Sequence, residues 1–212
     1  MQHHLDISYK ASYTTLNELT TSTKHIWIVC HGYGQLAEHF VKRFDVFDPK
    51  EHFIVAPQGL SKFYIERFRK VGASWMTKED READLENQRS YFHQVFNHLF
   101  SDINLEDYKV HLLGFSQGGS TICRLAVYQR VVFDTLILWA GAFPSELIKE
   151  NFDFIKSSAL LKVVIGNQDE YYDPRKFQKE IDKAEQATGL THELIRFEGK
   201  HVIDRGVLRN VL

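Results

Sequence analysis

Five short apolar runs recur along the chain, and they constrain its fold more than any other feature. Each is rich in Ile, Val and Leu and ends in Gly or in a loop-forming residue. They occupy residues 25–32, 52–59, 109–115, 135–141 and 161–167. Continuous apolar runs, unlike alternating ones, are typical of parallel strands buried on both faces of a sheet. Two further runs alternate, and we expect edge strands at 192–199 and, antiparallel to its neighbour, at 7–15.

Segments with helical character lie between these runs. Residues 80–100 carry apolar side chains on one face and acidic residues early, and residues 174–189 begin with Pro and end with Gly. A third helix is predicted over residues 118–132. The alternation predicts a mostly parallel sheet with helices on both faces. At 212 residues, without a linker, repeat or low-complexity segment, we expect a single α/β domain spanning residues 1–212.

Composition excludes several classes of function. The chain is 43% hydrophobic and 25% charged, as expected of a globular protein. Its formal net charge of -2, with no basic block, argues against nucleic-acid binding. The first residues resemble no secretory signal, and no apolar run reaches the ~18 residues of a membrane span. Cys30 and Cys123 lie in apolar segments and are interpreted as reduced core thiols. We therefore expect a soluble cytoplasmic protein without stable membrane insertion.

The sequence GFSQGG, residues 114–119, places a serine at a sharp turn between a predicted strand and a predicted helix. Gly114 and Gly118 leave room for a crowded backbone, and Ser116 lies at the apex, as a nucleophilic serine requires. One alternative is a glycine-rich turn with an incidental serine. Another is a phosphate-binding loop, but the P-loop lysine and the G-x-G-x-x-G spacing are missing. We interpret Ser116 as a nucleophile.

A nucleophilic serine needs a base and an orienting carboxylate, which on this kind of fold follow in the order acid, then histidine. Asp169, Glu170 and Asp173 follow the fifth apolar run, and His201 follows the last predicted strand. Asp169 is favoured as the acid because it comes first after the strand, and Glu170 is the runner-up. His201 is the predicted base.

Two backbone N–H groups are needed to bind the developing oxyanion. We expect one from Gln117, directly after the nucleophile, and one from Tyr33 in the glycine-rich stretch HGYGQ. His31 in that stretch is interpreted as structural. The HQVFNH stretch at 93–98 does not place its histidines on one helical face and HExxH is absent, so no metal site is predicted.

Several aromatic residues fall in segments expected near the mouth of this site. Most aromatic side chains belong to cores, but Trp75, Phe143 and Tyr171 are candidates for lining an acyl or aryl pocket. Residues 142–160 are long enough for one crossover helix but too short for a separate cap domain. Access to the site is therefore expected to be open.

Together HGYG, the AP pair at 56–57, Trp75, GFSQGG, the loop of Asp169, and His201 resemble the phospholipase/carboxylesterase family. This family of the α/β-hydrolase superfamily includes acyl-protein thioesterases and bacterial carboxylesterases. The resemblance implies an α/β-hydrolase fold without a large cap domain and a cofactor-free hydrolase. It also implies Ser116, Asp169 and His201 as the triad. The sequence departs from the family pattern at Gln35, where Asp is usual, and in the loop that follows Asp169.

From these observations we expect a serine hydrolase that cleaves short-chain acyl or small aryl esters through an acyl-enzyme on Ser116. One alternative is an acyl thioesterase or lysophospholipase, and another is a non-catalytic ligand-binding protein on the same fold. The expected partner is a small-molecule ester. A homodimer is left open by the sequence.

Overall fold

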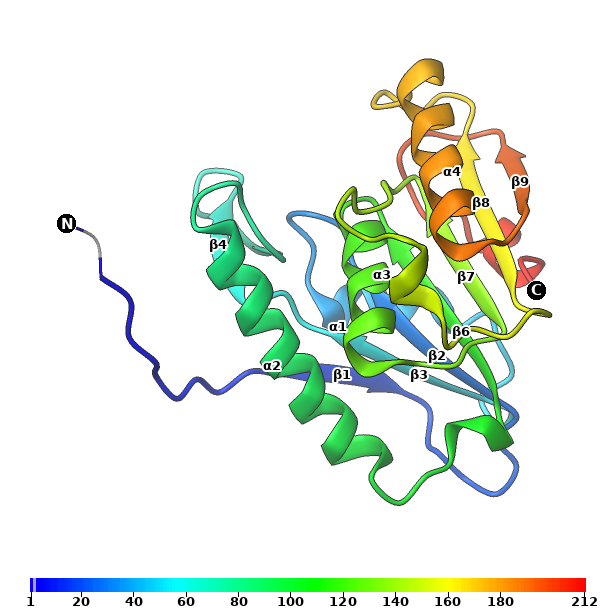
Figure 1. The fold of residues 1–212 in the computed structure, drawn as a ribbon, viewed down its shortest axis with the longest axis horizontal. Helices are drawn as coiled ribbons and strands as arrows, with labels where there is room; N and C mark the ends of the chain where they lie inside the picture. Colours follow the sequence, from blue (N-terminus) through cyan, green and yellow to red (C-terminus); the bar gives the residue numbers. More distant parts are fainter. Residues whose placement is uncertain (2) are drawn as a thin grey trace.

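The computed structural model describes residues 1 and 3–212, and it is built on a seven-stranded sheet in the order β1-β3-β2-β6-β7-β8-β9 (Figure 1). The strands are β1 (Tyr13–Leu16), β2 (His25–Cys30), β3 (His52–Pro57), β6 (Lys109–Phe115), β7 (Thr135–Trp139), β8 (Leu160–Gly166) and β9 (His192–Phe197). Strand β1 pairs antiparallel with β3, and all other neighbours in the sheet are parallel. The predicted mostly parallel sheet is confirmed.

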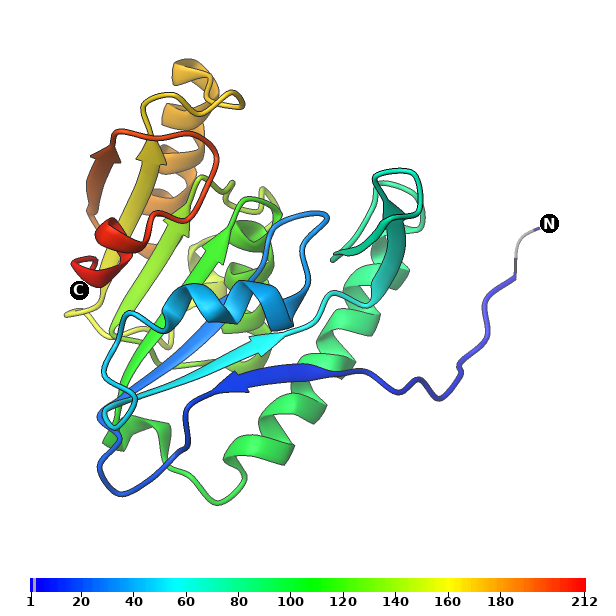
Figure 2. The same ribbon diagram turned by 180° about the vertical axis from the view of Figure 1, so that it is seen from behind.

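Helices cover both faces of this sheet. On one face lie α2 (Arg81–Phe100), α3 (Gln117–Gln129) and α4 (Pro174–Thr188) (Figure 1). On the other lie α1 (Ala37–Phe40), the 3-10 helix η1 (Val41–Phe44) and α5 (Arg205–Arg209) (Figure 2). None of the helices in the described part of the chain combines the length and apolarity needed to cross a membrane.

Neighbouring residues of one strand belong to different cores. In β2, Ile26 and Ile28 pack into the core beneath α2 and α3, whereas Trp27 and Val29 pack into the core beneath α1 and α5. All four side chains are fully buried. This two-sided burial is the reason the strand shows no apolar–polar alternation.

The N-terminal edge strand is shorter than the predicted 7–15. It begins only at Tyr13, which pairs with Pro57, the last residue of β3. Of the described residues before Tyr13, residues 3–12 have no strand partner, and the segment extends away from the sheet (Figures 1 and 2). The alternation of apolar residues in this segment therefore does not correspond to a buried face: Ile7 and Tyr9 are exposed.

Two connections differ from expectation. The predicted crossover helix between β7 and β8 is absent, and that connection contains only a 3-10 turn, η3 (Lys149–Phe152). It buries Phe143 and Phe152 against each other, with ring centroids 5.9 Å apart, instead of forming a helical apolar stripe. Conversely, a separate antiparallel hairpin of β4 (Ser61–Ile65) and β5 (Lys70–Ser74) forms where no strand was predicted.

Three histidines meet on neighbouring strands at the amino edge of the sheet: His52 on β3, His25 on β2 and His111 on β6. The His25 and His52 rings stack with centroids 4.4 Å apart, and His25 Nδ1 lies 2.9 Å from His111 Nε2. The Trp27 indole N–H donates to His52 Nδ1 at 3.0 Å. Burial lowers the pKa of all three histidines, to about 4 for His52 and about 3 for His111.

We predict that this histidine cluster makes the fold sensitive to acid. Because the folded-state pKa values lie below the ordinary value of 6.5, the unfolded chain takes up protons that the folded chain does not as pH falls. The free energy of unfolding should therefore fall from about pH 6.5 to about pH 4. Each histidine contributes up to ~1.4 kcal/mol per pH unit.

Urea denaturation of the wild type and His111→Gln across this pH range measures the effect. The slope of stability against pH should be smaller in His111→Gln by up to one proton, whatever its stability at pH 7. The control is His93→Gln on the exposed side of α2, which should keep the wild-type slope. Equal slopes in the wild type and His111→Gln would refute the prediction.

Candidate active site

Ser116 occupies a strained corner between β6 and α3. Its backbone has φ 53° and ψ -119°, a left-handed conformation that costs a residue with a side chain ~1–3 kcal/mol. A Cβ on Gly114 would lie 2.2 Å from the carbonyl oxygen of Gly118, and one on Gly118 would lie 2.1 Å from that of Cys30. Only glycine fits at either position, so the two glycines allow α3 to start directly against the sheet.

The residues after β8 and β9 form a carboxylate–imidazole pair. Asp169 Oδ2 lies 2.7 Å from His201 Nδ1, and Asp169 Oδ1 accepts a hydrogen bond from the Tyr171 N–H at 2.9 Å. The Asp169 side chain is 1% exposed and the His201 side chain 14%. A carboxylate only accepts, so this bond places the proton on His201 Nδ1 and leaves Nε2 able to accept one.

The other two acids of this loop are placed differently. Asp173 is the N-cap of α4, where its side chain accepts hydrogen bonds from the N–H groups of Arg175 and Lys176. Glu170 is exposed. Of the three acids considered from the sequence, Asp169 is the one in contact with His201.

His201 lies beside Phe115, the last residue of β6. The His201 ring packs against the ring of Phe115, the residue before Ser116, with centroids 4.8 Å apart. It also packs against the ring of Tyr171, again with centroids 4.8 Å apart. The Ser116 hydroxyl makes no hydrogen bond with His201 or with any other described residue. Nucleophile–base contacts are often longer than a hydrogen bond in ligand-free enzymes and tighten with substrate. The structure thus brings the three residues to one edge of the sheet.

The loop after β2 is held rigidly, with one amide left unpaired. The Gly34 N–H donates to the Ala73 carbonyl at 2.8 Å, and Gln35 Oε1 accepts from the Gly32 N–H at 2.8 Å. Within the described residues the N–H of Tyr33 makes no hydrogen bond. The Gln117 N–H opens α3, where no intrahelical acceptor exists. These are the two amides predicted to bind an oxyanion.

His31 serves this loop as a structural residue, as expected. It is fully buried, and burial lowers its pKa to about 4. Its Nε2 accepts a hydrogen bond from the Gly59 N–H at 3.0 Å, so the proton is on Nδ1, which donates to the Gly32 carbonyl at 2.9 Å. A neutral histidine therefore joins the loop after β2 to the segment after β3.

The aromatic residues considered for the substrate pocket are divided between core and surface. Tyr171 is 75% exposed and contacts His201. Trp75 is only 1% exposed, because its indole N–H donates to the buried His31 carbonyl at 2.8 Å. Phe143 is 3% exposed and packs against Phe152. The structure places Trp75 and Phe143 in the core and not on the surface of the site.

The first turn of α3 is attached to the segment after β5. The Gln117 amide donates to the Met76 carbonyl at 2.9 Å and to Ser74 Oγ at 3.0 Å, and its oxygen accepts from the Trp75 N–H at 3.2 Å. The sequence predicted a role only for the backbone N–H of Gln117. Its side chain fixes the turn that carries the candidate nucleophile.

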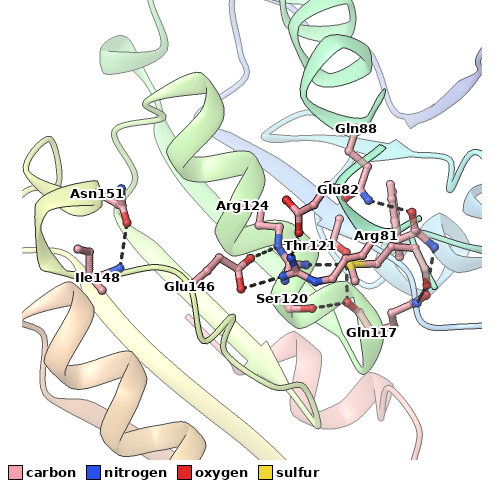
Figure 3. Close-up of polar contacts among 12 residues, drawn as sticks. Arg81, Glu82, Gln88, Gln117, Ser120, Thr121, Arg124, Glu146, Ile148 and Asn151 are labelled. Atoms are coloured by element: carbon pink, nitrogen blue, oxygen red, sulfur yellow. Dashed lines mark hydrogen bonds and ion pairs between the residues drawn. The ribbon is translucent and has the colours of Figure 1, made fainter. Parts of the chain in front are cut away.

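An ion-pair network around the buried Arg124 lies further along α3 (Figure 3). Arg124, with a 5% exposed side chain, donates to Glu146 Oε1 at 2.7 Å, and Glu146 Oε2 lies 3.0 Å from an Arg81 nitrogen. The network joins α2, α3 and the connection after β7. The sequence signal that was missed is an arginine within the apolar helical stretch TICRLAV.

Comparisons with known proteins give matches among solved structures. No protein-family model and no curated protein matches the sequence. Among solved structures, acyl-protein thioesterase 2 from Zea mays matches with TM-score 0.67 and 17% identity, over 95% of this chain and 96% of that chain. A carboxylesterase from Mesorhizobium loti matches with TM-score 0.68 and 16% identity, over 94% and 92%. A phospholipase/carboxylesterase from Dyadobacter fermentans matches with TM-score 0.66 and 18% identity, over 97% of each chain.

These structural matches establish the fold. The chain has the α/β-hydrolase fold, and it is similar to carboxylesterases and acyl-protein thioesterases across nearly its whole length. The fold class expected from the sequence is confirmed. Fold alone does not determine chemistry, so activity has to be argued from the site.

We predict that the close contact at the corner is essential for folding. The substitution Gly118→Ala places a methyl group against the Cys30 carbonyl oxygen, 2.1 Å away, where only backbone movement relieves the clash. Its free energy of unfolding should fall by ~1–3 kcal/mol or more. The control is Gly206→Ala, whose Cβ meets only a side-chain oxygen of Asp204 at 3.2 Å. A urea midpoint for Gly118→Ala equal to that of Gly206→Ala would contradict this account.

Proposed function

We propose that this protein is a carboxylic ester hydrolase that forms an acyl-enzyme on Ser116. The observation that carries the proposal is the left-handed Ser116 at the strand–helix corner, at the same sheet edge as the Asp169–His201 pair. A residue that keeps a costly backbone conformation at such a corner is typical of an activated nucleophile. The order of the three residues along the chain is that of α/β-hydrolases.

In the proposed reaction, Ser116 Oγ attacks the ester carbonyl while His201 Nε2 accepts the serine proton. The N–H groups of Tyr33 and Gln117 stabilise the tetrahedral oxyanion. His201 then gives its proton to the leaving alcohol, and the acyl group stays on Ser116. A water molecule, activated by His201, releases the acid and regenerates the hydroxyl. Asp169 holds the imidazole in the required tautomer throughout.

The similarity to solved carboxylesterases and to an acyl-protein thioesterase supports acyl transfer to water as the reaction class. Thioester hydrolysis is the second candidate, since the same residues would perform it. A non-catalytic binding protein is disfavoured because neither the strained backbone of Ser116 nor the hydrogen-bonded Asp169–His201 pair is needed for binding alone.

We predict that the proposed triad acts as a unit. Ser116→Ala should remove labelling by a fluorophosphonate probe and lower kcat for p-nitrophenyl acetate at least ~10³-fold. Asp169→Asn should lower kcat ~10³–10⁴-fold because it leaves the imidazole in the wrong tautomer. Combining Ser116→Ala with His201→Ala should cost no more than either change alone.

Asp173→Asn is the matched control, because asparagine caps a helix as well as aspartate does. Its kcat should stay close to the wild-type value, as should that of Glu170→Gln. If Asp169→Asn keeps wild-type activity while either control loses it, the acid is misassigned. If the fluorophosphonate probe labels Ser116→Ala as strongly as the wild type, the proposal itself fails.

We also predict a preference for short acyl or small aryl esters. The connection after β7 contains no α-helix, and Trp75 and Phe143 are buried in the core, so neither that connection nor these two rings can cover a long acyl chain. A buried methylene contributes ~0.8 kcal/mol and an exposed one contributes little. Across a series of p-nitrophenyl esters, kcat/KM should therefore stop rising after the first few acyl carbons. A continuous rise through palmitate, or a palmitoyl thioester that exceeds every oxyester, would favour the thioesterase alternative.

A further inference from the structure

A pocket of about 330 Å³ opens beside His201. One wall is the loop after β2 together with α1 and η1, and the other is the tip of the β4–β5 hairpin. The residues directly after His201 complete the lining. This volume is at the small end of the range for ligand pockets, so it suits a compact group rather than a long chain.

The position of the pocket identifies the part of a substrate that it would hold. Of the residues to which the proposed function assigns a role, His201 alone lines it. In that reaction His201 donates its proton to the leaving oxygen, so the group beyond that oxygen must lie next to the imidazole. The pocket is therefore the place for the alcohol half of the ester, and this step rests on the proposed function.

The charges in the pocket are not balanced. Lys70 Nζ lies 2.8 Å from Glu66 Oε1, so these two lining charges neutralise each other. The remaining full charge in the lining is the guanidinium of Arg43, and it makes no ion pair with any described residue. The nearby Asp45 is paired with Arg205. An unpaired guanidinium presents a fork of N–H donors that matches the two oxygens of a carboxylate.

Apart from the polar Gln35 and His39, the other side chains of the lining are apolar and include Phe40, Ile65 and Val71. Such a lining accommodates the flat body of a small ring, with one polar anchor to fix its orientation. We propose that the pocket binds the leaving half of an ester whose alcohol or phenol carries a carboxylate. Arg43 is the residue that selects for the charge.

Two matched esters test this proposal: 4-acetoxybenzoate, whose leaving phenol carries a carboxylate, and 4-acetoxybenzamide, whose leaving phenol is neutral. The wild type should prefer the anionic ester. In Arg43→Gln the ratio of their kcat/KM values should fall about tenfold, because a charge-assisted hydrogen bond is lost. Most of the change should be in KM for the anionic ester.

Lys42→Gln is the matched control. It removes the same charge from the adjacent exposed position, which is not part of the pocket lining, so the ratio should stay at the wild-type value. A wild type without preference for the anionic ester overturns the proposal. So does an equal fall of the ratio in both variants, which would indicate only the general field of the protein.

A binding measurement separates this proposal from the proposed function. Calorimetry with Ser116→Ala compares the leaving groups themselves, 4-hydroxybenzoate and 4-hydroxybenzamide. Stronger binding of the benzoate, lost when Arg43→Gln is added, supports the pocket even if neither ester is hydrolysed. Binding of both at equal strength, or of neither, refutes it even if the protein is an active esterase.

Discussion

The close packing of backbone around Ser116 is the constraint on which the rest of the site depends. Gly114 and Gly118 bring β6, the start of α3 and the end of β2 into contacts that no Cβ could share. The left-handed conformation of Ser116 costs ~1–3 kcal/mol, which the buried face of α3 offsets. The same contact places the Gln117 N–H beside the loop of Tyr33. The proposed nucleophile and the proposed oxyanion donors thus depend on the same close backbone packing.

The parallel sheet separates two groups of histidines that differ in chemistry. Loops at the carboxyl ends of the strands gather at one edge, where Asp169 accepts a hydrogen bond from Nδ1 of His201, the proposed base. At the amino edge, His25, His52 and His111 are in contact with one another and with Trp27, and burial lowers their pKa values. The acid-sensitive histidine cluster therefore lies at the opposite end of the sheet from the histidine of the candidate site.

The sequence pattern predicted the features that depend on residues close together in the chain. The run at 109–115 is β6 from end to end, and GFSQGG carried enough turn chemistry to locate the corner at Ser116. The location of Trp75 depends on a partner distant in sequence, the His31 carbonyl, which no periodicity reveals. The β4–β5 hairpin likewise arises from cross-strand pairing such as Phe63 with Gly72. Aromatic residues near a site can belong to its lining or its support, and only packing decides which.

Two arginines, Arg124 and Arg43, differ in whether a carboxylate of the protein pairs with them, and this decides which of them can bind a ligand. Arg124 is buried, and Glu146 compensates its charge, since an unpaired buried guanidinium would be strongly destabilising. That pair, with Arg81, holds a connection that contains no α-helix against α2 and α3. Its donors are thereby committed to the fold. Arg43 is exposed and has no such partner among the described residues, so its donors remain available beside His201. The charge of Arg43, which no described side chain neutralises, is therefore the one that an anionic substrate would pair with in the proposed pocket.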